Sequence, residues 1–205
     1  MMFSPENIEN EFFLKLGFSF DAKDLAKGKL LISEPFLGDP NFNRSVVLLL
    51  EYAAEGGAFG VVLNKTTELF MSDIIEGLPN HRFPFHYGGP VEQDNLFYIH
   101  RLGEALEDAK PVAPGLWWGG NFEQLKQLVL NGSVTEDEVM FFGGYSGWEA
   151  QQLEGELKER SWILSALEKD LIWNVAPDQM WRSSLKQLGS KFSIMADFPE
   201  NPGLN

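Results

Sequence analysis

The sequence contains no cysteine, which excludes disulfides, a thiol nucleophile and cysteine-ligated metal sites. Long apolar runs are also missing: the longest, residues 45–50, has the length of a strand, whereas a membrane-spanning helix needs about 18 apolar residues. Basic residues are scarce, since 16 Lys and Arg stand against 30 Asp and Glu and give a net charge of −14. Affinity for nucleic acids comes mainly from Lys and Arg that neutralise phosphates. We therefore do not expect direct DNA binding.

What is present fits a globular protein. The 205 residues are 44% hydrophobic and 22% charged, which is close to the average of soluble domains. This length suits one hydrophobic core, so we expect a single domain over residues 1–205. The N-terminal stretch MMFSPENIENEFF carries glutamates where a signal peptide carries basic residues. We expect a cytoplasmic protein without membrane attachment.

The pattern of apolar residues, glycines and prolines predicts both strands and helices. We expect strands at 29–33, 46–52, 59–64, 85–87, 96–100, 116–118 and 139–142, with hairpins closed at 55–58 and 88–95. Helices are expected at 4–17, from 72 to 77, and at 121–132, 149–160 and 177–188. The first is an N-terminal docking helix, and residues 197–205 form an extended tail. Because the strands come in neighbouring groups, the pattern favours an α+β fold over a doubly wound parallel sheet.

The stretch FFGGYSGWEAQQLEGEL, residues 141–157, raises the question of catalysis. A serine nucleophile on a strand-to-helix turn needs small residues two positions to either side. Ser146 has Gly144 on one side but Trp148 on the other, and all three histidines precede it in the chain. A small-molecule hydrolase that uses Ser146 with His86 or His100 is therefore the alternative hypothesis. Our main interpretation is a non-catalytic glycine corner from which Tyr145 and Trp148 project.

The sequence also gives no pattern for a metal ion or a cofactor. The histidines do not have the spacing of known metal motifs. The glycine motifs that bind phosphate, G-x-x-x-x-G-K-[ST] and G-x-G-x-x-G at a strand-to-helix junction, are also absent from the sequence. If residues 96–101 form a strand, His100 shares a face with Leu96 and Tyr98 and is a hydrogen-bonded core residue. Gly88-Gly89-Pro90 is interpreted as a turn. We expect no metal and no cofactor.

The loop of residues 37–45 carries an arginine at the start of an apolar strand. Asp39-Pro40 predicts a turn, and Arg44 comes just before the run of residues 45–50. Two interpretations remain open: a structural ion pair of Arg44 with Asp39 or Glu34, or an arginine presented to an anionic ligand.

Several stretches in the same order resemble the bacterial AlgH/YqgE family. They are GKLLISEPFLGDPNFNRSVVLLLEY at 28–52, GAFGVVLNK at 57–65, YGGPVEQDNLFYIH at 87–100, FFGGYSGWEAQQLEGEL at 141–157, Trp162, and PDQMWRSSL at 177–185. The resemblance implies a branched, mainly antiparallel sheet rolled into a pseudo-barrel with helices outside. It implies little about function: the family is of uncharacterised function, and one member carries the label of a transcriptional regulator of exopolysaccharide synthesis. The family motif has alanine where Ser146 stands, which weighs against Ser146 as shared machinery.

Together these observations predict a non-catalytic binding or regulatory module with an unknown protein or small-molecule partner. The surface that we expect to bind it combines loop residues and aromatic side chains between apolar strands. Its members are Asp39, Arg44, Asn64, Lys65, Gly88, Gly89, Tyr145 and Trp148.

Overall fold

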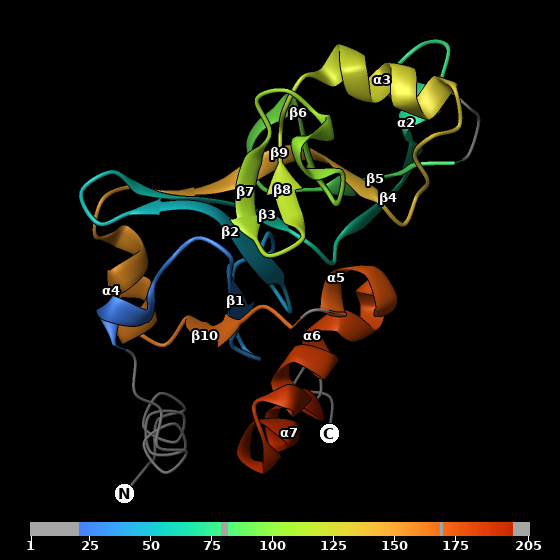
Figure 1. The fold of residues 1–205 in the computed structure, drawn as a ribbon. Coiled ribbons are helices and arrows are strands. Elements are labelled where there is room, and N and C mark those ends of the chain that lie inside the picture. Colours follow the sequence, from blue (N-terminus) through green and yellow to red (C-terminus); the bar gives the residue numbers. More distant parts are fainter. Residues whose placement is uncertain (1–20, 79–81, 169, 199–205) are drawn as a thin grey trace, which may run out of the picture.

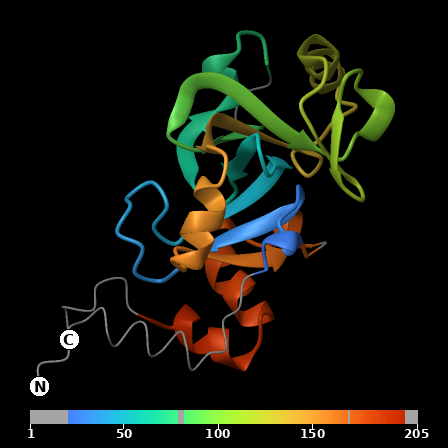
Figure 2. The same cartoon turned by 90° about the vertical axis from the view of Figure 1, so that its left-hand side faces the viewer.

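A computed structural model describes residues 21–78, 82–168 and 170–198 of the chain (Figures 1 and 2). Within these residues, ten strands form one sheet. Eight of them have the order β10-β1-β2-β3-β9-β6-β8-β7, while β5 pairs with β9 and β4 pairs with β5. The strands are β1 Lys29–Ser33, β2 Val46–Ala53, β3 Gly57–Val62, β4 Thr66–Phe70, β5 Pro84–Tyr87, β6 Val91–His100, β7 Lys110–Ala113, β8 Leu116–Trp118, β9 Val139–Trp148 and β10 Trp162–Ala166. The predicted helix at 4–17 and most of the predicted tail lie outside the described residues.

The sheet is branched at β9, because this strand has different neighbours along its length. Its first half pairs with β6 in antiparallel fashion and with β5 in parallel fashion. Its last residues pair with β3, from Gly60 opposite Ser146 to Ala58 opposite Trp148. Strand β6 bends strongly (Figure 2), so the sheet curls without closing into a barrel. The predicted α+β class with a branched, mainly antiparallel sheet is thus confirmed.

Helices cover different parts of the curled sheet. They are the 3-10 turns η1 Ala22–Asp24 and η2 Gly103–Ala105, and the helices α2 Met71–Ile74, α3 Phe122–Leu130, α4 Gln152–Lys158, α5 Leu171–Asn174, α6 Pro177–Gln187 and α7 Ser190–Ala196. In Figure 1, α2 and α3 lie at one end of the molecule, while α5, α6 and α7 follow one another at the opposite end. The helix predicted at 121–132 is observed as α3, and the Asn121 side chain caps its start by accepting a hydrogen bond from the Gln124 amide.

The apolar run in β2 is continuous because this strand is buried on both faces. Leu48 and Leu50 point into the cluster that contains Trp181 of α6. Val47 and Leu49 point to the opposite face, into the cluster that contains Leu153 of α4. A strand between two layers of helices has no solvent face and therefore no polar alternation. A third cluster packs α2 and α3 against the C-terminal end of β6 and the N-terminal end of β9.

Two sequence predictions about turns are wrong. Residues 85–87 and 96–100 do not form a hairpin: β5 and β6 flank β9 on opposite sides, each paired to it. The stretch of residues 143–147 is not a corner, because it continues β9 up to Trp148, and the chain turns only at 149–151, where Gln151 has a positive φ. The glycines allow close approach instead. A Cβ on Gly143 would lie 2.7 Å from the Phe85 ring.

Candidate functional site

Ser146 is buried within the sheet. Its side chain is 0% exposed, and its hydroxyl donates a hydrogen bond to the Gly88 carbonyl at 3.2 Å. Its backbone is part of the pairing between β3 and β9. Ser146 therefore serves as a link between β9 and the segment that follows β5, in a position without solvent access.

The two described histidines lie away from Ser146. His86 stands opposite Phe142 and His100 opposite Val139 in the strand registers. At about 3.3 Å per residue, these positions are roughly 13 Å and 23 Å from Ser146 along β9. The structure thus does not bring the three side chains of the hydrolase alternative together.

Both histidines make hydrogen bonds with the backbone. The Nε2–H of His100 donates to the Gly119 carbonyl at 3.0 Å, and its Nδ1 accepts from the Leu102 amide at 3.2 Å. His86 is bonded through Nδ1 to the Phe141 carbonyl at 3.2 Å. Burial lowers the pKa of each imidazole because it disfavours the charged form. Neutral histidines in these positions hold neighbouring segments together.

Two of the residues predicted to bind a partner, Asp39 and Lys65, come together at an exposed edge. The Asp39 carboxylate accepts a hydrogen bond from the Asn41 amide at 2.8 Å, and Lys65 Nζ donates to the Pro40 carbonyl at 3.0 Å. The Tyr87 hydroxyl donates to the Asn41 side chain at 3.0 Å. Burial lowers the pKa of Lys65, and the negative charge of Asp39 acts in the opposite direction. These contacts join the loop of residues 37–45 to the chain around β4 and β5.

Arg44 and Asn64 hold the start of β2. The Asn64 side chain accepts from the Val46 amide at 2.8 Å and donates to the Arg44 carbonyl at 2.9 Å. The Arg44 guanidinium lies 4.9 Å from the Trp181 ring and donates to the Phe198 carbonyl at 2.6 Å. Arg44 thereby fastens this loop to the C-terminal helices. These are contacts of a structural kind.

Gly88 and Gly89 lie between strands rather than on an open turn. A Cβ on Gly88 would come within 2.2 Å of the Gly144 carbonyl oxygen, and one on Gly89 within 2.2 Å of the Tyr145 backbone. Both glycines are buried. They are required by close backbone packing next to β9.

Tyr145 and Trp148 point to opposite faces of β9, as an odd separation along a strand requires. The Tyr145 ring lies 5.0 Å from Phe59. Trp148 belongs to the cluster on the α4 side, where it is 6% exposed and donates through Nε1 to the Glu156 carboxylate at 2.8 Å. The eight predicted residues therefore differ in exposure: Asp39 is exposed, Arg44, Asn64, Lys65 and Tyr145 are partly buried, and Gly88, Gly89 and Trp148 are buried.

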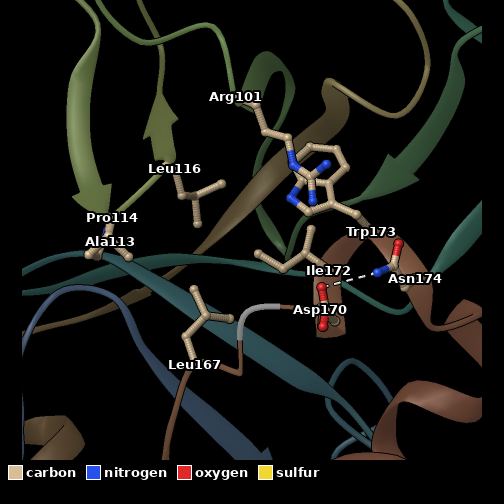
Figure 3. Close-up of a pocket in the computed structure, with 10 residues that line it drawn as sticks. Arg101, Ala113, Pro114, Leu116, Leu167, Asp170, Ile172, Trp173 and Asn174 are labelled. Carbon is tan, nitrogen blue, oxygen red and sulfur yellow. Dashed lines mark hydrogen bonds between the residues drawn. The ribbon is translucent and has the colours of Figure 1, made fainter.

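The structure also contains a pocket of about 920 Å³ that the sequence did not indicate (Figure 3). It lies between the turn that joins β7 to β8, the end of β6, and α5 with the segment before it. Its lining combines an apolar wall with three polar side chains. The residues are Arg101, Ala113, Pro114, Gly115, Leu116, Leu167, Asp170, Ile172, Trp173 and Asn174.

Local geometry places the polar groups of this pocket. The Arg101 guanidinium lies over the Trp173 indole, 4.7 Å from the ring centre. The Asp170 carboxylate accepts a hydrogen bond from the Asn174 amide at 3.1 Å, one turn along α5 (Figure 3). Pro114-Gly115 is a sequence signal for the turn at the rim, with a positive φ at Gly115. No pattern in the sequence indicated that Arg101 meets Trp173.

Some other site types find no support in the described residues. Across residues 21–78, 82–168 and 170–198, no group of three His, Asp or Glu side chains is arranged to hold a metal ion. In the same residues, no helix combines the length and the apolar character needed to cross a membrane.

Comparison with solved structures first defines the class of fold. A protein from Corynebacterium diphtheriae superimposes with a TM-score of 0.74 at 17% identity, over 90% of this chain and 97% of that one. The AlgH protein from Pseudomonas aeruginosa superimposes with a TM-score of 0.69 at 25% identity, over 89% of this chain and 98% of that one. The curled, branched sheet with its helices is therefore an AlgH-like fold.

Sequence comparison then gives the family. The model of the AlgH-like family (DUF179) matches residues 30–193. A UPF0301 protein from Cytophaga hutchinsonii is 42% identical over 182 residues, which cover 88% of this chain and 100% of the relative. A UPF0301 protein from Bacteroides thetaiotaomicron is 41% identical over 181 residues, which cover 88% and 91%. The chain belongs to the AlgH-like family, as its motifs indicated.

Proposed function

We propose that this protein is a non-catalytic binding module of the cytoplasm that acts through a small molecule held in the pocket of Figure 3. The pocket itself is the observation that carries the proposal. Its volume of about 920 Å³ falls in the range of roughly 300–1,000 Å³ that is usual for ligand sites.

The composition of the pocket supports this assignment. Ligand sites are mostly apolar and contain a few polar groups that fix orientation. Here the wall formed by Leu116, Leu167 and Ile172 supplies apolar surface, while Arg101 and Asp170 supply opposite charges. The wall comes from segments far apart in the sequence, so a bound ligand would connect the β7–β8 hairpin with α5.

Binding without catalysis agrees with the positions of the nucleophile and base candidates. Ser146, His86 and His100 are all buried and hydrogen-bonded to backbone groups. A hydrolase needs a nucleophile and a base within hydrogen-bond reach of each other and of the substrate. The hydrolase alternative therefore has no assembled site to support it.

A protein partner is a second candidate, favoured by the exposed edge at Asp39 and Lys65. The exposed Asp39 and the partly buried Lys65 lie in two segments that hydrogen bonds join, from Lys65 to the Pro40 carbonyl and from Tyr87 to Asn41. The net charge of −14 would favour a basic partner and disfavour DNA. A regulatory role would then run through protein contact.

A thermal-shift screen against a metabolite panel tests the main proposal. A ligand present at about a hundred times its dissociation constant adds roughly 2.7 kcal/mol to the stability. Pro114→Trp should abolish the shift, because the indole occupies the rim of the pocket. Pro111→Trp is the matched control on the same hairpin, outside the lining, and should respond as the parent does. A shift that persists in Pro114→Trp places the ligand elsewhere and refutes this site.

Asp39→Ala and Lys65→Ala test the second candidate in affinity capture. Both should lose a partner that Pro114→Trp retains. If the two variants keep every partner of the parent, the exposed edge is not the interface.

A further inference from the structure

We infer that the ligand of this pocket is a small organic monoanion, a carboxylate attached to an apolar or aromatic body. This inference rests on the proposed function and specifies the chemistry of the same site. The carboxylate binds the Arg101 guanidinium, and the body lies along Leu116, Leu167 and Ile172 (Figure 3).

Arg101 is held in position by the backbone and by Trp173. Its amide donates to the Glu138 carbonyl at 2.9 Å, which continues the strand pairing past the end of β6. The indole covers one face of the guanidinium, at 4.7 Å. In the described part of the chain, the ion pairs within 4.0 Å do not include Arg101. Its positive charge therefore remains for a ligand.

The stacked geometry suits a carboxylate. A guanidinium is planar and presents paired N–H groups that match the two oxygens of a carboxylate. Because the indole covers a face, the edge that carries the N–H groups stays uncovered. Stacking also restricts the long side chain before the ligand arrives, which reduces the entropy lost on binding.

Asp170 limits how much negative charge the site accepts. Its exposed carboxylate lies in the same pocket and receives a hydrogen bond from the Asn174 amide. A phosphate or a dicarboxylate would bring a second negative charge toward Asp170 and into the field of a chain with net charge −14. A single carboxylate gains the contact with Arg101 at a lower cost in repulsion. The apolar wall favours a body without charge.

Three probes of one shape test the charge preference by isothermal titration calorimetry: 1-naphthoate, 1-naphthamide and 1-naphthylmethylammonium. We expect the acid to bind about tenfold more tightly than the amide, because it makes a charge-assisted pair with Arg101. Arg101→Gln should abolish the preference of the acid over the amide. Arg101→Lys, which keeps the charge but loses the paired donors, should retain only part of it.

Two further variants make the test specific. Asp170→Asn should tighten the acid by about two- to threefold, since it removes an exposed like charge. Arg82→Gln is the matched control, because Arg82 also stacks on an aromatic ring, Phe83 at 5.4 Å, but does not line this pocket. It should leave all three affinities unchanged.

The outcomes separate this inference from the proposed function. If the acid and the amide bind equally and Pro114→Trp abolishes both, the pocket binds ligands and only the anion preference is refuted. An acid preference that survives Arg101→Gln refutes the assignment to Arg101. If none of the three probes binds up to millimolar concentration, the ligand class is refuted, while the pocket itself stands or falls with the thermal-shift screen of Pro114→Trp.

Discussion

Replacing Glu156 by alanine should destabilise the protein strongly, although this side chain is only half-buried. One oxygen of its carboxylate accepts hydrogen bonds from two indoles, Trp148 at 2.8 Å and Trp162 at 2.7 Å. The other accepts from the Gln152 side chain at 2.9 Å. The two indoles are 6% and 1% exposed, so water does not readily replace the lost acceptor.

The magnitude follows from the two buried donors. Leaving one buried polar group without a partner costs about 1–3 kcal/mol. For two indoles beside a half-buried carboxylate we expect roughly 2–4 kcal/mol from Glu156→Ala. Since 1 kcal/mol lowers the midpoint of a protein of this size by about 2–4 °C, the thermal midpoint should fall by roughly 4–16 °C. Glu156→Gln keeps a neutral acceptor and should cost only about 1 kcal/mol.

Urea unfolding followed by circular dichroism measures these differences. Glu159→Ala is the control, because this exposed glutamate lies at the end of the same helix and should change stability by less than about 0.5 kcal/mol. If Glu156→Ala is no less stable than Glu159→Ala, the carboxylate does not satisfy the two indoles. The reasoning about this cluster would then be wrong.

Three further predictions test the packing and the buried groups. Gly88→Ala should destabilise the protein by about 1–3 kcal/mol through overpacking, whereas Gly155→Ala in α4, where a Cβ meets nothing within 4 Å, should stabilise it by about 0.5–1 kcal/mol. Equal effects of the two substitutions in chemical unfolding would contradict the overpacking at Gly88. The pKa of His100 is lowered by burial, so its contribution to the free energy of unfolding should be complete above about pH 6.5 and should fall below that pH, by at most about 1.4 kcal/mol per pH unit. Unfolding at pH 7.5, 6.5 and 5.5 should show a weaker pH dependence for His100→Gln than for the parent, and an equal pH dependence would contradict this role. Arg44→Ala should lower the stability by about 1–3 kcal/mol in thermal unfolding, because the contacts with Trp181 and Phe198 are lost. The exposed Arg182→Ala is the control and should cost less than about 0.5 kcal/mol, so similar losses in both variants would refute the role of Arg44.

The sequence predicted the strands whose residues are apolar and flanked by turn signals. The ranges 29–33 and 116–118 agree with β1 and β8 to the residue. Strands β4, β7 and β10 were not predicted. Most residues of β4 and half of those in β7 are exposed and follow no clear apolar alternation. Strand β10 begins with buried residues, but no glycine or proline beside it marks its ends. The pattern predicts a turn at the glycines of β9, since glycine usually marks one. Here they make room for neighbouring backbone and for the Phe85 ring, which a single sequence does not reveal.

The candidate site was less predictable than the fold. The loops of Asp39 and Lys65, which the sequence marks as polar, contact each other through the bond from Lys65 to the Pro40 carbonyl. Trp148 was expected to project, yet it is buried against α4 through Glu156 of its own motif. The pocket depends on contacts such as that between Arg101 and Trp173, which lie in separate elements. Such contacts depend on how the sheet curls, and local patterns carry no information on that.

The branching of the sheet at β9 has a consequence for the way the chain folds during synthesis. Strands β3, β5 and β6 each pair with β9, so one edge of each stays unpaired until residues 139–148 are made. One edge of β1 stays unpaired until β10 is made, since Lys29 lies opposite Ala166. The emerging N-terminal half therefore carries unpaired strand edges until most of the chain has left the ribosome. Long-range pairing of this kind folds slowly and exposes the chain to aggregation. We expect a nascent chain of this protein to depend on chaperones more than its modest size suggests.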